Sequence, residues 1–248
     1  PLFPFDMSVV ENARGHAMRA AIIALMLMFG SQAGAENKQV SFGGDILNLP
    51  KPKDLCEMAD HGPTSEIFKF HAALQAKAKN RLLAVYEDCL FLEQRTFSTV
   101  ESSPPEWLLF TAFNPNPDKE ILFKNYSTQR FIEEMAKMVS NIDANEIQKW
   151  AGDITDQVLE DLSYDENIAF GKPIDLGVLD IGDAVYHGFI MDVKGGNESF
   201  IVGAVFSYLL VNGVAVNIYK YKNYKNKQTI KDLLFESKYY VARVVHSN

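Results

Sequence analysis

The period of the apolar positions changes several times in the first half of the chain, and each change predicts a new element. Apolar side chains at three- and four-residue steps from Thr64 to Lys79 are typical of an amphipathic helix. Segments on either side alternate or are continuously apolar, which favours strands. The expected strands are an arm from Val40 to Pro50 that breaks at Gly43-Gly44, a strand within Arg81 to Leu92 that turns helical near Cys89, and a buried strand from Glu106 to Phe113.

Two helical segments are indicated in the middle of the chain. Ser127 or Thr128 precedes apolar residues at helical spacing and is expected to cap the first of them. Asp143 with Glu146 three residues later is similar to the order of a capping box, so a second helix is expected to begin there. Because glycine weakens a helix interior, Gly152 is expected to kink this helix or to separate it from its continuation.

From Ala169 onward the apolar period changes to two, which predicts strands. Asn212-Gly213 is the sharpest turn signal in the chain, because the pair suits the two positive-φ positions of a type I′ hairpin. A last amphipathic helix is expected to follow the hairpin, with Asp232 placed to complete its cap. The expected elements are strands from Ile174 to Ile181, Ala184 to Val193, Ser199 to Val211 and Val214 to Tyr219, then a helix from Thr229 to Val245.

These elements together predict an α+β fold, with a mostly antiparallel sheet covered by helices and a C-terminal hairpin followed by a terminal helix. No internal repeat or low-complexity linker divides the chain. Residues 36–248 are enough for one large soluble α+β domain, which is the organisation that we expect. Two smaller domains would also fit this length.

The amino-terminal segment reads as a cleavable secretory signal. Basic Arg19 is followed by an unbroken apolar run from Ala20 to Phe29 and then by the small residues Ala33-Gly34-Ala35. This order is that of a signal peptide, so we expect residues 1–35 to comprise the signal and its upstream residues, with cleavage before Glu36.

The alternative to cleavage is a membrane anchor. A bilayer span needs about 20 apolar residues, and the apolar run before Gly30 is only about half as long. No later segment is long and apolar enough to span a bilayer, so no transmembrane segment is expected after signal cleavage. Translation is expected to start at Met18, with Met7 as the other possible start.

Charge and cysteine content narrow the compartment and the partners. The chain has 24 Lys and Arg residues against 32 Asp and Glu residues, a formal net charge of −8, and this balance argues against a nucleic-acid partner. Its two cysteines, Cys56 and Cys89, both follow the expected signal. Two thiols in an exported domain are expected to form a disulfide, in the periplasm or outside the cell. Two separately buried thiols are the alternative.

Catalytic signals are weak. No nucleophile elbow, phosphate-binding loop or dinucleotide fingerprint follows an expected strand, and the histidines lack the spacing of metal ligands, so no catalytic residue, metal or cofactor is assigned. His187 and acid pairs such as Asp153 with Asp156 are the only candidates for acid and base chemistry. Such pairs arise by composition alone in an acidic chain, and we interpret them first as solvated surface.

One run near the end of the chain interleaves lysines with aromatic residues. It suggests a surface that binds an anionic partner such as lipid headgroups, a polysaccharide or an acidic protein. The competing interpretation, which we favour, is a solvated connection between the last strand and the last helix. The candidate residues are Lys220, Tyr221, Lys222, Tyr224, Lys225 and Lys227.

Two resemblances bear on the fold. The stretch from Asn80 through Arg81-Leu82-Leu83-Ala84 to Asp88-Cys89, preceded by Cys56, resembles a pattern in uncharacterised exported proteins of proteobacteria. That resemblance supports a disulfide between the two cysteines and implies no activity. The late hairpin, the lysine-containing run and the terminal helix are similar in order to the extrinsic PsbP-type subunit of photosystem II. This likeness implies a helix-covered antiparallel sheet and an accessory role.

The leading functional hypothesis is an exported accessory protein that binds a protein or an envelope component. It rests on the export signal, the expected disulfide and the weakness of the catalytic signals. One alternative is an envelope hydrolase that uses acids or His187 in a cleft, which requires these groups to converge in a pocket. The other is a carrier of a small apolar ligand held between sheet and helices.

Overall fold

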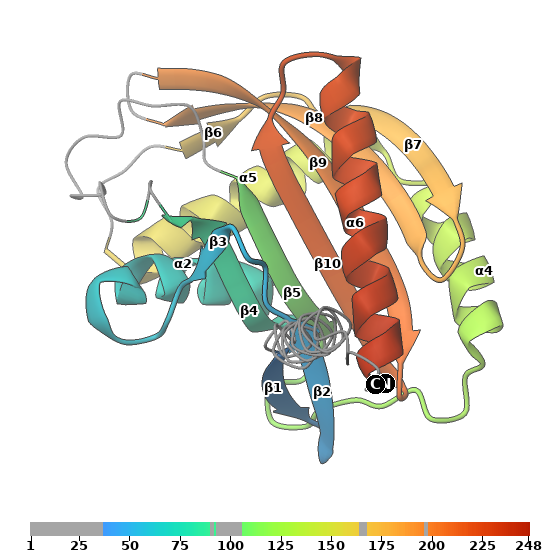
Figure 1. The fold of residues 1–248 in the computed structure, drawn as a ribbon. Coiled ribbons are helices and arrows are strands. Elements are labelled where there is room, and N and C mark those ends of the chain that lie inside the picture. The colour runs from blue at the N-terminus through green and yellow to red at the C-terminus, as the bar shows by residue number, and fades with distance from the viewer. Residues whose placement is uncertain (1–36, 90–91, 93–105, 164–167, 196–197) are drawn as a thin grey trace, which may run out of the picture. The chain divides into compact units, whose positions relative to one another are not determined.

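The computed structural model describes residues 37–89, 92, 106–163, 168–195 and 198–248. The expected signal lies outside these residues. Asn37–Asn248 form one compact unit. Figure 1 shows the elements in chain order: β1 (Asn37–Phe42), β2 (Asp45–Pro50), β3 (Leu55–Glu57), the short 3-10 helix η1 (Gly62–Thr64), α2 (Ser65–Lys77), β4 (Asn80–Asp88), β5 (Trp107–Phe113), α4 (Thr128–Val139), α5 (Ala144–Asp161), β6 (Ile168–Phe170), β7 (Ile174–Ile181), β8 (Val185–Gly195), β9 (Glu198–Val211), β10 (Val214–Asn223) and α6 (Lys227–Ser247).

An eight-stranded antiparallel sheet organises the fold. Its strand order is β3-β4-β5-β10-β9-β8-β6, and β7 pairs with β8, while β1 and β2 form a separate hairpin. Every strand pair in the sheet is antiparallel. The α+β fold with a C-terminal hairpin and a terminal helix is therefore confirmed.

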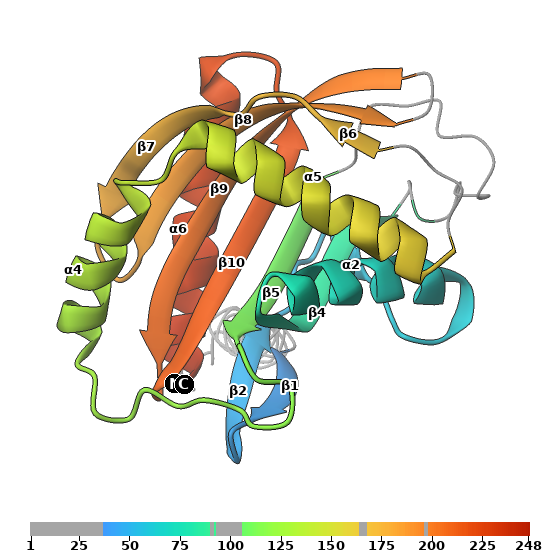
Figure 2. The same ribbon diagram turned by 180° about the vertical axis from the view of Figure 1, so that it is seen from behind.

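Helices cover the two faces of the sheet differently (Figures 1 and 2). α6 packs along one face against β9 and β10, and its Leu233, Val241 and Val244 are fully buried there. On the other face α2 packs on β4 and α4 on β9, whereas α5 runs across this side with its main contacts to α2 and β6. Most side chains of the central strands that face α6 are apolar and buried, as Phe110 and Ile218 illustrate with 0% exposure each.

The hairpin between β9 and β10 forms as the sequence predicts. Asn212 has φ +50° and Gly213 φ +77°, so both central residues occupy the left-handed region that a type I′ turn requires. Val211 pairs with Val214 directly beside the turn, and this pairing fixes the register of β9 and β10.

Two helix predictions need correction. Gly152 neither kinks nor ends a helix, because α5 is continuous and its second half is held by buried Val158 and Leu159. The cost of an interior glycine, roughly 1 kcal/mol, is smaller than the gain from such burial. α6 begins two residues earlier than expected, with Asn226 as its cap: the Asn226 side chain accepts a hydrogen bond from the Gln228 amide at 2.8 Å.

Candidate functional site

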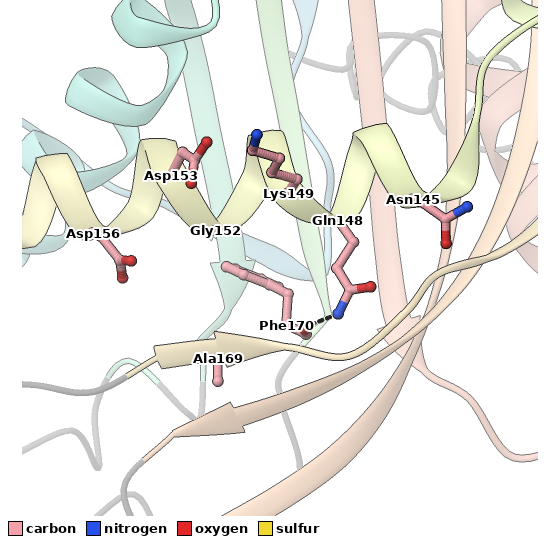
Figure 3. A pocket seen from close by; sticks show the side chains of 8 residues that line it. All are labelled: Asn145, Gln148, Lys149, Gly152, Asp153, Asp156, Ala169 and Phe170. Carbon is pink, nitrogen blue, oxygen red and sulfur yellow. Dashed lines mark hydrogen bonds between the residues drawn. The ribbon is translucent and has the colours of Figure 1, made fainter.

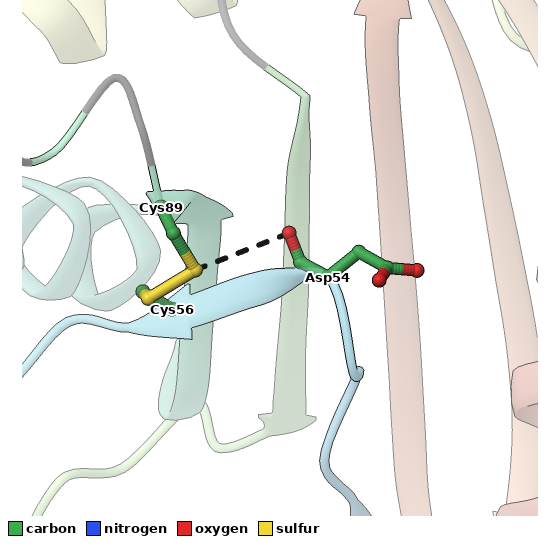
Figure 4. Close-up of a disulfide and its surroundings, with 3 residues drawn as sticks. All are labelled: Asp54, Cys56 and Cys89. Carbon is green, nitrogen blue, oxygen red and sulfur yellow. Dashed lines mark hydrogen bonds between the residues drawn. A yellow bond between two sulfur atoms is a disulfide. The ribbon is translucent and has the colours of Figure 1, made fainter.

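The expected disulfide is present. Cys56 in β3 and Cys89 at the end of β4 are bonded, with a Cα–Cα distance of 4.8 Å across a sequence separation of 33 (Figure 4). The Asp54 carbonyl lies 4.0 Å from the Cys89 Sγ atom. The bond ties the short edge strand β3 to β4. It adds to the three residue pairs between these strands, the backbone hydrogen bond from Met58 to Val85 and the ion pair of Glu57 with Lys38.

The lysine–tyrosine run does not form one surface. Residues 220–223 belong to β10, so the interpretation of this part as a solvated connection is wrong. Because side chains alternate along a strand, Lys220 and Lys222 point toward α6 and Tyr221 points to the opposite face. Tyr224 is half-buried, with its amide bonded to the Ile201 carbonyl. The alternation of lysine and tyrosine is itself the period of a strand, and this signal could have been recognised in the sequence.

Lys220 and Lys222 are neutralised inside the protein. Lys220 is 1% exposed, and its Nζ contacts Glu106 Oε1 and lies 3.6 Å from Glu236 Oε2. Lys222 Nζ lies 3.1 Å from Glu106 Oε2 and 2.5 Å from Glu236 Oε1. Two bases therefore share two acids, so these lysines do not present positive charge to an anionic surface.

The environment of the two lysines differs. Burial lowers the pKa of Lys220, and the nearby charge of Glu106 opposes this effect only in part. Burial also acts to lower the pKa of Lys222, but its hydrogen bond to Glu236 and the charge of Glu106 outweigh burial, so that pKa is raised. The network is a structural link between β10, α6 and the residue before β5.

The last two residues of the run join a different surface on α6. Lys227 begins an exposed stripe that continues at three- and four-residue steps, which place side chains on one side of a helix. Phe235 is 76% exposed and Tyr239 51%, unusually high for aromatic side chains. We call the stripe the α6 outer face; it comprises Lys227, Lys231, Phe235, Lys238, Tyr239, Ala242 and Val245, and exposed Lys225 lies just before it. Exposed Asp232, which accepts a hydrogen bond from Gln228, lies at its border.

Positive charge gathers at the amino-terminal end of the α6 outer face. Among the described residues, Lys225, Lys227 and Lys231 have no ion-pair partner, whereas Lys238 is paired with Asp180. No acidic residue lies in the first turn of α6. Because a helix amino terminus already carries partial positive charge, three lysines there concentrate a positive potential that acids in this turn would normally offset.

His187 is an interior residue. It is 0% exposed, its Nε2 lies 2.6 Å from Asp175 Oδ1, and its ring centroid lies 4.2 Å from that of Phe189. Its Nδ1 has no hydrogen-bond partner among the residues that the structure describes. The structure does not bring His187 to the surface depression that contains the acid pair singled out above.

That depression lies between α5 and β6 (Figure 3). Its volume is about 420 Å³. Figure 3 shows that Asp153 points away from β6 while Asp156 points toward it, so the two carboxylates do not converge, and Gln148 donates a hydrogen bond to the Phe170 carbonyl at 3.1 Å. It is lined by Asn145, Gln148, Lys149, Gly152, Asp153, Asp156, Ala169 and Phe170.

Metal and membrane features can be stated only for the part of the chain that the structure describes. Within it, no cluster of three or more His, Cys, Asp or Glu side chains is arranged to hold a metal ion. No helix there has the length and apolar character to cross a bilayer. Neither a scan against protein-family models nor a search of curated proteins finds a match to this sequence. The two resemblances described above remain predictions.

Proposed function

We propose that this protein is an exported accessory protein that acts by binding, and that the α6 outer face attaches it to anionic phospholipid at a membrane surface. The observation that carries the proposal is the combination of exposed Phe235 and Tyr239 with the unpaired lysines beside them. Export is supported by the signal-like segment and by the disulfide, which is typical of oxidising compartments.

The chemistry of the face favours lipid over other anionic partners. Aromatic side chains with lysines along one side of a helix are the composition of helices that lie in a bilayer interface. Each lysine near an anionic membrane contributes about 1 kcal/mol, and burial of a phenylalanine contributes about 2 kcal/mol. The face is the outward side of a helix that already packs on the sheet, so docking needs no unfolding.

Vesicle sedimentation tests this proposal. The protein is expected to sediment with vesicles of phosphatidylcholine and phosphatidylglycerol, to bind pure phosphatidylcholine much more weakly, and to lose binding as salt is added. Phe235→Ser and the double variant Lys227→Gln/Lys231→Gln are each expected to weaken binding about tenfold or more, from the contributions given above.

Matched control variants distinguish binding through the α6 outer face from non-specific binding to vesicles. Trp150→Ser removes an aromatic side chain of 54% exposure from α5, and Lys137→Gln removes an exposed lysine from α4. Both variants are expected to bind vesicles like the unmodified protein. Equal binding to neutral and anionic vesicles, or equal losses in the α6 and control variants, would show that the α6 outer face is not the docking site.

A further inference from the structure

A continuous row of rings crosses the face of the sheet opposite α6. Each ring lies next to the following one. The centroid distances are 6.2 Å between Trp107 and Tyr221 and 5.7 Å between Tyr221 and Phe206. They are 5.0 Å between Phe206 and Phe189 and 4.2 Å between Phe189 and His187. These residues come from β5, β10, β9 and β8, which are adjacent in the sheet. We call this row, with Tyr208 and Tyr219 beside it, the aromatic face.

Solvent reaches one part of the aromatic face, whereas His187 and Phe189 in the same row are buried. Trp107, Phe206, Tyr208 and Tyr221 are only partly buried. Side chains from the same strands that point toward α6 are closed off, as Leu108, Val205 and Leu209 show with 0% exposure each. On the opposite side α2 packs on β4 and α4 on β9, whereas α5 has its main contacts to α2 and β6 (Figure 2).

Three phenol groups gather on this face. Tyr208 interacts electrostatically with Tyr219 and Tyr221, and burial raises the pKa of all three hydroxyls, to about 12 for Tyr219. They therefore stay protonated and able to donate hydrogen bonds at neutral pH.

Among the described residues, only one of these hydroxyls has a hydrogen-bond partner. The Tyr219 hydroxyl accepts a hydrogen bond from the Asn80 amide at 3.4 Å. Within the described residues the hydroxyls of Tyr208 and Tyr221 have no hydrogen-bond partner. These two groups are therefore available to a bound molecule.

The charges around the aromatic face limit what can bind. Glu87 is buried and accepts a hydrogen bond from the Trp107 ring nitrogen at 2.7 Å, and Asp175 is held by His187. Two carboxyl groups thus border the aromatic face, which disfavours an anionic ligand. Rings in a row offer a flat apolar platform, and free phenols offer donors for oxygen acceptors.

We propose that the aromatic face binds an uncharged, flat aromatic molecule that carries carbonyl or ether oxygens, with the Tyr208 and Tyr221 hydroxyls as hydrogen-bond donors. This site is separate from the α6 outer face, which lies on the other side of the sheet, and neither depends on the other.

The neutral naphthyl ketone dye Prodan is a suitable probe. Trp150→Phe leaves Trp107 as the only tryptophan, because the chain has two. Dye emission is expected to shift to the blue and to saturate, and Trp107 emission is expected to fall in step as the dye binds beside it. A blue shift without a change in Trp107 emission places the dye elsewhere and overturns the proposal, as does the absence of saturable binding.

Removal of the two hydroxyls tests their role. Tyr208→Phe/Tyr221→Phe keeps both rings and is expected to weaken Prodan binding about fivefold for each lost hydrogen bond of about 1 kcal/mol. Tyr239→Phe on the α6 outer face is the matched control and is expected to bind normally. Unchanged affinity in a folded double variant overturns the donor role, and the Trp107 measurement still decides the site if that variant does not fold.

Discussion

Lys220 shows how a single side chain can look like a surface feature in sequence and be an interior one in the fold. Its ammonium group is buried between Glu106 and Glu236, and both acids belong to other segments of the chain than β10. Removal of one member of a buried ion pair destabilises a protein, because it leaves the charge of the other member uncompensated. If Lys220 is removed, Glu106 and Glu236 still pair with Lys222 and are partly exposed to solvent, so the loss of stability is smaller.

We predict that Lys220→Met lowers the free energy of unfolding by about 2 kcal/mol, less than the 3–5 kcal/mol typical of a fully buried pair. Urea denaturation of the variant measures the change. Lys227→Met, which removes an exposed lysine without an ion pair, is expected to stay within about 0.5 kcal/mol of the unmodified protein.

A double variant checks the cause. Addition of Glu106→Gln to Lys220→Met removes the acid left in excess, so the double variant is expected to be less destabilised than the sum of the two single changes. Simple additivity would mean that the Lys220 and Glu106 side chains do not interact in the folded protein.

At the scale of elements, two glycines illustrate opposite uses of the same residue. Gly213 has φ +77° in the β9–β10 turn, and a Cβ there would lie 3.3 Å from the Lys124 amide nitrogen. Gly152 lies in the interior of α5, where a Cβ would meet no atom within 4 Å. The backbone needs glycine at the first position and is weakened by it at the second.

We predict that Gly213→Ala destabilises the protein by about 1–2 kcal/mol, and that Gly152→Ala stabilises it by about 0.5–1 kcal/mol. Thermal and urea unfolding of the two variants measure both changes. Two shifts of the same sign would contradict the backbone explanation.

Elements with local signals could be predicted from the sequence. Ser127 and Asp143 cap the helices that they were expected to cap, and Asn212-Gly213 forms its turn. The predicted element boundaries were wrong where distant residues determine them. β10 continues through the lysines because Glu106 and Glu236 neutralise their charge. Lys220 and Glu106 are 114 residues apart, so the local sequence does not indicate this pairing. The three-residue strand β6 also depends on distant partners: it pairs with β8 and accepts a hydrogen bond from Gln148 of α5 at the Phe170 carbonyl.

The candidate sites were harder to predict than the fold. Lys225 and Lys227 were found because a charged run is visible in sequence, whereas their neighbours Lys231, Phe235 and Tyr239 join them only through the helical geometry of α6. The aromatic face was missed altogether. Its rings come from four strands, and their arrangement depends on a strand order that the sequence does not specify.

At the scale of the whole molecule, the disulfide secures the edge of the sheet. It closes a loop across a separation of 33 residues between β3 and the end of β4. Loop entropy gives a stabilisation of about 3–4 kcal/mol for a loop of this length. Because β3 pairs only with β4, loss of the bond is expected to free this strand first.

We predict that reductant lowers the free energy of unfolding by about 3–4 kcal/mol, and that Cys56→Ala/Cys89→Ala unfolds at the same urea concentration as the reduced protein. Mass spectrometry with and without reductant establishes the bonding state of each sample. A protein with both thiols free and an unchanged midpoint would contradict this assignment.

The β9–β10 turn has a consequence beyond its own stability. After the Asn212-Gly213 turn, the even-numbered side chains of β10 lie on one side of the sheet and the odd-numbered ones on the other. Lys220 and Lys222 therefore contact α6, and Tyr219 and Tyr221 belong to the aromatic face. An inserted residue in that turn would reverse this parity along the whole strand. Ammonium groups would then lie among aromatic rings, and phenols against Glu236. The length of this two-residue turn thus determines that the lysines form their ion pairs on one side of the sheet and the tyrosines lie on the other.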